Sequence, residues 1–127
     1  MSTQVKEFMK SPVACSALPT DVGGVRDLMT QKECHAIPLV EFGENKEVLI
    51  RGIVTSDDLM GVYDDTINIQ QVMTKNVHSI APGSSAQSAA QIMLEKNCHH
   101  LLVMEEKEIV GIISSIDFAK LVADKGI

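Results

Sequence analysis

The sequence has no long hydrophobic run, which argues against a membrane-spanning protein. No stretch of about 18 consecutive apolar residues occurs, so a transmembrane helix is not expected. The first ten residues, MSTQVKEFMK, are polar and charged and lack the apolar segment of a secretory signal peptide. We therefore expect no membrane association and a cytoplasmic location.

Basic and aromatic residues are also scarce. Only two arginines occur, Arg26 and Arg51, and the formal net charge is −6. Nucleic-acid binding depends on clustered Lys and Arg that neutralise phosphates, and single-strand binders add aromatic side chains that stack on bases. Aromatic residues make up 3% of the chain and Trp is absent. We therefore predict that nucleic acid is not a partner, which leaves a small ligand or an unknown protein.

The cysteines give no sign of a disulfide framework or a zinc knuckle. Cys15, Cys34 and Cys98 are odd in number and show no CxxC spacing. Reduced thiols are the simplest reading for a cytosolic chain. The 127 residues, 45% of them hydrophobic, suffice for one compact module with a core of its own.

An internal repeat organises the chain. Met29 recurs as Met93, and the pair Cys34-His35 recurs 64 positions later as Cys98-His99. The offset then falls to 59, because the first copy carries extra residues between Glu41 and Arg51 that we expect to form a longer hairpin loop. The copies span residues 1–66 and 67–127.

Both copies predict the same order of elements: an extended segment, a helix, two strands and a second helix. The strands are expected at 36–42 and 48–55, and again at 100–105 and 109–114. We therefore predict an α+β fold of tandem βαββα repeats related by a pseudo-two-fold axis. One copy alone would be marginal in stability, so the copies should pack together and create a cleft for a ligand.

Capping residues and apolar stripes define the expected helices. Thr20 is the expected cap of the first helix, and Ser84 or Ser85 caps its counterpart. The closing helices should begin near Ser56 and near Ser115. The expected apolar stripes are Val22, Val25 and Met29; Ala86, Ala89, Ala90 and Met93; and Phe118, Leu121 and Val122.

The spacings Thr55-x-x-Asp58 and Ser114-x-x-Asp117 support two readings. As capping boxes they would stabilise a helix start by about 1 kcal/mol and need no ligand. As ligand contacts, the Asp could accept hydrogen bonds from two ribose hydroxyls, and the Ser or Thr would lie beside backbone N–H groups that favour a phosphate. The same residue can serve both roles.

The Cys-His pairs invite a metal reading that we do not favour. Adjacent strand residues point to opposite faces, so one pair does not readily chelate one ion. Each Cys stands where a buried aliphatic residue is expected at a strand start, which favours core packing. Buried thiols would also lack the lowered pKa of a nucleophile. We therefore predict neither a metal site nor catalysis.

Two motifs in register carry a family resemblance: Gly52-Ile53-Val54-Thr55-Ser56-Asp57-Asp58 and Gly111-Ile112-Ile113-Ser114-Ser115-Ile116-Asp117. With the βαββα order they make the chain similar to the CBS-domain family, named for cystathionine β-synthase. The resemblance covers nearly the whole chain. It implies a Bateman module, a paired repeat that binds AMP, ADP, ATP or S-adenosylmethionine and regulates an attached enzyme or channel.

The resemblance also implies roles for individual residues. The Asp of each motif would hold the ribose, its Ser or Thr would lie beside the phosphate, the opening strand would contact adenine, and His would reach phosphates. The residues concerned are Asp58, Thr55, His35 and Val13 in the first copy, and Asp117, Ser114, His99, His100 and Val77 in the second.

Two hypotheses stay open. One is an adenine-nucleotide sensor, and the other is a protein-interaction or dimerisation module that has lost its ligand. Asp57 beside Asp58 favours the second hypothesis at the first site, because an extra carboxylate repels a phosphate. At the matching position of the second site, the uncharged Ile116 causes no such repulsion of a phosphate. The family resemblance also implies a homodimer.

Overall fold

The computed structural model describes residues 3–126, which form two compact units. The repeat-1 unit is Ala14–Val77, and the repeat-2 unit joins the segment ending at Val13 to the chain from His78 onward. The units differ in extent from the sequence copies at 1–66 and 67–127, because the segment ending at Val13 packs with the second copy and residues 67–77 pack with the first. No helix within residues 3–126 has the length and apolar character needed to cross a membrane.

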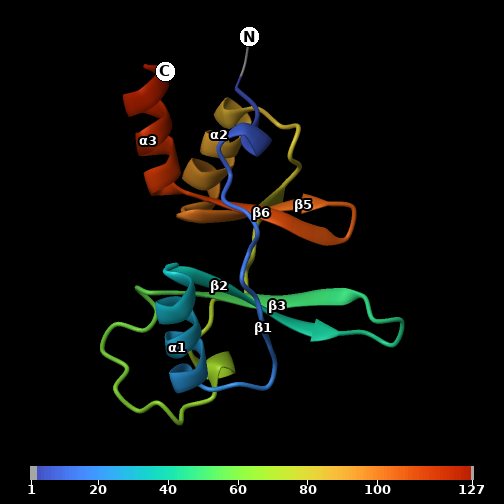
Figure 1. The fold of residues 1–127 in the computed structure, drawn as a ribbon, viewed down its shortest axis with the longest axis vertical. Helices are drawn as coiled ribbons and strands as arrows, with labels where there is room; N and C mark the ends of the chain where they lie inside the picture. Colours follow the sequence, from blue (N-terminus) through green and yellow to red (C-terminus); the bar gives the residue numbers. More distant parts are fainter. Residues whose placement is uncertain (1–2, 127) are drawn as a thin grey trace. The chain divides into compact units, whose positions relative to one another are not determined.

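A three-stranded sheet, one α-helix and the short 3-10 helix Ile69–Gln71 build the repeat-1 unit (Figure 1). Strand β1 pairs parallel with β2, and β2 pairs antiparallel with β3. The elements are β1 (Ser16–Ala17), α1 (Val22–Lys32), β2 (Ala36–Phe42) and β3 (Val48–Thr55).

The repeat-2 unit has the same sheet with an additional helix. Strand β4 pairs parallel with β5, and β5 pairs antiparallel with β6. Both helices lie over the same face of this sheet (Figure 1). The elements are β4 (Ser79–Ile80), α2 (Ala86–Lys96), β5 (His100–Glu105), β6 (Glu108–Ser114) and α3 (Ser115–Lys125).

The two hairpins share an irregularity at equivalent positions. The register shifts between Leu39 and Val40 in one sheet and between Val103 and Met104 in the other. The connecting loop is longer in the first hairpin, residues 43–47, than in the second, residues 106–107, as the extra residues predict. The predicted α+β class with tandem repeats is confirmed.

Capping explains where the first helix of each unit begins, with one correction. Ser85 caps α2 by accepting from the Ser88 backbone N–H at 3.0 Å, as predicted. Thr20 was the wrong residue for α1. Asp21 is the cap, because its carboxylate lies 2.8 Å from the Gly24 backbone N–H and, being charged, is the stronger acceptor.

The closing helix expected near Ser56 is absent from the repeat-1 unit. Residues 56–61 form turns, held by bonds from Leu59 N to Ser56 O and from Met60 N to Asp57 O, both 3.2 Å. Gly61 follows with φ +81°. A helix persists in a protein mainly by burying an apolar face, and after Leu59 this segment offers an exposed Met60. In contrast, α3 buries Leu121.

Each unit has its own hydrophobic core. The stripe residues Val22, Val25 and Met29 are buried in one, and Ala89 and Met93 in the other, as predicted. Val122, on the apolar face predicted for the closing helix, is 53% exposed. The two cores are Val22, Val25, Met29, Ile37, Leu39, Val54, Leu59 and Ile69, and Val5, Ile80, Ala89, Met93, Leu101, Val103 and Ile113.

Each sheet also pairs with a segment that precedes the opening strand of a repeat. Lys10 exchanges backbone bonds of 2.9 and 3.0 Å with Ile112, and Thr74 exchanges bonds of 2.9 and 2.8 Å with Ile53. Val5, fully buried, anchors the first of these segments in the repeat-2 core. The chain start is thus an integral part of the repeat-2 unit.

Candidate functional site

The Thr55–Asp58 spacing forms a reciprocal box at the end of β3. The Thr55 backbone N–H donates to Asp58 Oδ2 at 2.9 Å, and the Asp58 N–H donates to Thr55 Oγ1 at 3.3 Å. Both residues are half-buried. The box fixes the Asp58 carboxylate against the backbone even though no helix follows it.

The Ser114–Asp117 spacing forms the equivalent box at the start of α3. Asp117 Oδ2 accepts from the Ser114 backbone N–H at 2.9 Å and from the Ser114 hydroxyl at 3.1 Å. Asp117 is only 5% exposed, and its Oδ1 lies 3.5 Å from Lys10 Nζ. The Ser114–Asp117 box therefore caps α3 as predicted, whereas the Thr55–Asp58 box forms with no helix after it. Asp117 carries a cation partner as well.

A histidine-serine pair accompanies each box. His35 Nδ1 lies 3.1 Å from Ser56 Oγ, and His99 Nδ1 lies 3.2 Å from Ser115 Oγ. The same serines donate their backbone N–H to the carbonyl of the same histidine, at 2.9 and 3.0 Å. In each pair the imidazole Nδ1 faces the serine hydroxyl, so Nε2 is the ring nitrogen that points away from the serine.

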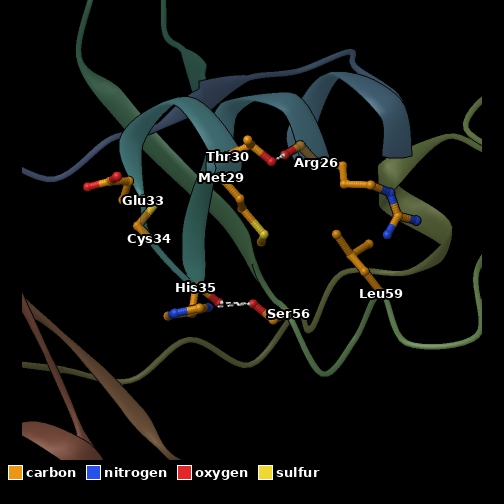
Figure 2. Close-up of a pocket in the computed structure, with 8 residues that line it drawn as sticks. All are labelled: Arg26, Met29, Thr30, Glu33, Cys34, His35, Ser56 and Leu59. Atoms are coloured by element: carbon orange, nitrogen blue, oxygen red, sulfur yellow. Dashed lines mark hydrogen bonds between the residues drawn. The ribbon is translucent and has the colours of Figure 1, made fainter.

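A hollow of about 510 Å³ lies beside the first pair, within the repeat-1 unit (Figure 2). This volume falls within the range of small-molecule sites. Figure 2 shows Met29 extending from α1 into the hollow, with His35 and Ser56 along one border. The lining residues are Arg26, Met29, Thr30, Glu33, Cys34, His35, Ser56 and Leu59.

Arg26 is held in place at the border of this hollow. Its Nη2 donates to the Val62 carbonyl at 2.6 Å, and its Nε lies 3.6 Å from Asp65 Oδ1. These contacts fix the guanidinium to the loop after the turns. In the repeat-2 unit the position of Leu59 is taken by Phe118, whose ring packs edge-to-face on Phe8 with centroids 5.2 Å apart.

The predicted site residues fall into two groups, one in each unit. Val13 was expected with the first copy and Val77 with the second. The structure reverses this, because the segment ending at Val13 belongs to the repeat-2 unit and Val77 to the repeat-1 unit. The repeat-1 unit thus contains His35, Thr55, Asp58 and Val77, and the repeat-2 unit contains Val13, His99, His100, Ser114 and Asp117.

The cysteines end helices rather than starting strands. Cys34 N–H donates to Met29 O and Cys98 N–H to Met93 O, both at 3.1 Å, just after a left-handed residue that terminates the helix. Both side chains pack on a core, as the non-metal reading expects. Burial raises the pKa of the Cys98 thiol, which lowers its thiolate fraction. Within residues 3–126 no three His, Cys, Asp or Glu side chains form a potential metal cluster.

Sequence reasoning missed four residues that the structure brings to these sites. Ser56 and Ser115 were interpreted only as helix starts. Each directly follows the Thr or Ser of its box, so a second hydroxyl recurs at the same place in both copies, and that recurrence was a usable signal. Lys10 and Arg26 gave no signal, since their partners Asp117 and Val62 lie far along the chain.

Comparison with known proteins agrees with this architecture. The CBS domain family matches the chain twice, over residues 5–65 and 69–124. The uncharacterized protein MJ0188 of Methanocaldococcus jannaschii is 30% identical over 128 residues, covering 98% of this chain and 46% of that protein. The CBS domain-containing protein YhcV of Bacillus subtilis is 29% identical, covering 92% of this chain and 84% of YhcV. The chain therefore spans less than half of MJ0188.

A solved structure supports the fold independently. The CBS domain pair of protein MJ0100, in complex with 5'-methylthioadenosine and S-adenosyl-L-methionine, superimposes with a TM-score of 0.84 at 21% identity. The match covers 98% of this chain and 99% of that one. Because the family matches nearly the whole chain in two copies, and each copy has the strand pairing described above, the protein belongs to the CBS domain family.

Proposed function

We propose that this CBS pair is a regulatory module that binds an adenine nucleotide, AMP, ADP or ATP, or the related S-adenosylmethionine, and that it performs no catalysis. The observation that carries the proposal is the duplicated constellation: in each unit a Ser/Thr–Asp box stands directly beside a His–Ser pair. Capping accounts for the box at the start of α3, but it explains neither the box that no helix follows nor the repeated histidines.

The chemistry of these groups suits a nucleotide. Each Asp uses Oδ2 within its box, so Oδ1 of Asp58 or Asp117 is the oxygen for ribose hydroxyls in charge-assisted hydrogen bonds. The imidazole Nε2 of His35 or His99 and the neighbouring hydroxyls are donors suited to phosphate oxygens. Adenine would contact the main chain near Val13 and Val77, and His100 would supplement His99.

Two further observations support an adenosine ligand. The hollow bordered by His35 and Ser56 has the volume of a small-molecule site. The CBS pair of MJ0100 holds two adenosine-derived molecules in its solved complex. We also propose a cytosolic location, because three thiols are compatible with a reducing compartment.

A ligand panel tests the proposal. We expect AMP, ADP, ATP or S-adenosylmethionine to raise the melting temperature and to give a saturable calorimetric signal. Binding should weaken as salt rises yet persist at moderate ionic strength, because partly buried hydrogen bonds are screened less than exposed charges. Guanosine 5'-monophosphate is a matched control for base recognition. No stabilisation and no heat with any of the four ligands would contradict the proposal.

The rival function, dimerisation without a ligand, has its own observation. Large apolar side chains are exposed on the two helices of the repeat-2 unit: Leu94 is 82%, Ile116 57% and Val122 53% exposed. Asp117, in addition, already has partners. Apolar side chains on neighbouring helices favour association, and we propose that the protein forms a homodimer through α2 and α3.

Light scattering tests the homodimer. At micromolar concentration we expect a mass near twice the 13.8 kDa of one chain. Val122→Glu would place a charge among the exposed apolar residues and should shift the mass toward that of the monomer. Met60→Glu, at a residue that is 76% exposed but lies in the repeat-1 unit, is the control and should leave the mass unchanged. A monomeric mass for the unaltered protein would remove the proposal.

A further inference from the structure

The two units differ in charge at one equivalent position. Lys10 and Thr74 occupy the same place in the repeat, and each exchanges backbone bonds with the strand that leads to its box. Lys10 adds an ammonium 3.5 Å from the Asp117 carboxylate. Thr74 carries no charge, and within the part of the chain that the structure describes Asp58 has no ion pair.

Neighbouring charges increase this difference. The repeat-1 box has Asp57 next to Asp58, where the repeat-2 box has the uncharged Ile116. Lys75 does not replace Lys10, since it occupies the position of Ser11 in the repeat. Arg26, at the border of the repeat-1 hollow, already contacts Asp65 and the Val62 carbonyl.

Lys10 is placed to respond to a ligand. Asp117 is 5% exposed, whereas the Lys10 side chain is 58% exposed, so the lysine lies between the buried carboxylate and solvent. A ribose hydroxyl that donates to Asp117 Oδ1 competes with the Lys10 ammonium for that oxygen. The displaced ammonium keeps a favourable position only if the ligand supplies a negative charge within its reach.

We propose that Lys10 is a specificity-determining residue that makes the repeat-2 site select phosphorylated adenine nucleotides, while the repeat-1 site takes uncharged or cationic adenosine compounds. This inference rests on the proposed function. When an anionic nucleotide binds, Lys10 exchanges Asp117 for a phosphate oxygen. A neutral nucleoside at the same site separates the ion pair without replacing it. The repeat-1 site, with two carboxylates and no lysine, favours ligands without negative charge.

AMP and adenosine form a suitable pair of probes, because they share base and ribose and differ only in the phosphate. Amide chemical shifts of Ser114 and Thr55 report binding at each site separately. For the unaltered protein we expect Ser114 to respond to AMP at lower concentration than to adenosine. Lys10→Met keeps the length of the aliphatic chain and removes the charge, and it should reduce the AMP preference at Ser114 about tenfold.

Two further variants make the test decisive. Lys10→Arg retains the charge and should retain the preference, whereas Thr74→Lys should shift the Thr55 site toward AMP. If Lys10→Met perturbs folding of the repeat-2 unit, Thr74→Lys carries the test alone. An unchanged AMP-to-adenosine ratio in Lys10→Met, or in Thr74→Lys at Thr55, overturns the inference. Absence of any shift with either probe in the unaltered protein instead overturns the proposed function.

Discussion

Replacing Asp117 by Ala is expected to lower the affinity for AMP by about thirtyfold, or ~2 kcal/mol, because the ribose loses a charged acceptor that the Ser114 box holds in position. Calorimetry measures the change directly. Asp58→Ala should cost less, since the repeat-1 site combines Asp57 with the lack of a lysine and should contribute less to AMP binding.

A folding defect is distinguishable from loss of the ribose acceptor. Asp117→Ala also removes a cap, which should reduce the free energy of unfolding by about 1 kcal/mol. Asp117→Asn keeps the size of the side chain and one accepting oxygen, so its loss of stability should be smaller while AMP binding still weakens. If Asp58→Ala abolishes AMP binding and Asp117→Ala leaves it intact, the ranking of the two sites is wrong.

Gly52→Ala is expected to reduce the free energy of unfolding by about 3 kcal/mol. A Cβ at Gly52 would lie 2.9 Å from the Thr74 carbonyl oxygen and 2.6 Å from Met73 Sδ. That carbonyl accepts the Ile53 N–H at 2.9 Å, so it cannot retreat without breaking the pairing between β3 and its neighbouring segment. Chemical denaturation gives the change in the free energy of unfolding.

Two glycines provide the comparison. At Gly111 the closest atoms belong to the flexible Met9 side chain, and the Lys10 carbonyl oxygen is farther away at 3.2 Å, so Gly111→Ala should cost only about 1 kcal/mol. Gly83 has no atom within 4 Å of a Cβ, and Gly83→Ala should be neutral or slightly stabilising. Equal losses at Gly52 and Gly83 would show that close backbone approach is not the reason for the motif glycine.

Local patterns predicted the strands and the boxes well. Residues 36–42 and 48–55 form β2 and β3 as expected, because apolar runs bounded by polar turns carry their own signal. The boxes form because the residues lie three apart. The prediction of a closing helix in the first copy was wrong because only the start of a helix has a local signal. Whether the helix continues depends on burying the residues that follow, and Met60 is 76% exposed.

Contacts between distant parts of the chain could not be predicted. Val5 and Lys10 belong to the first sequence copy, yet they pack into the unit of the second, where the Val5 N–H donates to Ser84 O and Lys10 pairs with Ile112 of β6. The hollow beside His35 likewise brings residues of α1 together with Ser56 and Leu59 of the turns. Both features follow from tertiary packing, for which the spacing of residue types carries no signal.

A crystal structure of the protein with AMP would show directly which side chains hold the nucleotide. We expect AMP at the Ser114–Asp117 box, with ribose hydroxyls within hydrogen-bond distance of the Asp117 carboxylate and the phosphate beside Lys10 and His99. Density for AMP that contacts neither Asp117 nor Asp58, or no AMP density in crystals grown at a concentration that saturates the calorimetric titration, would contradict this expectation.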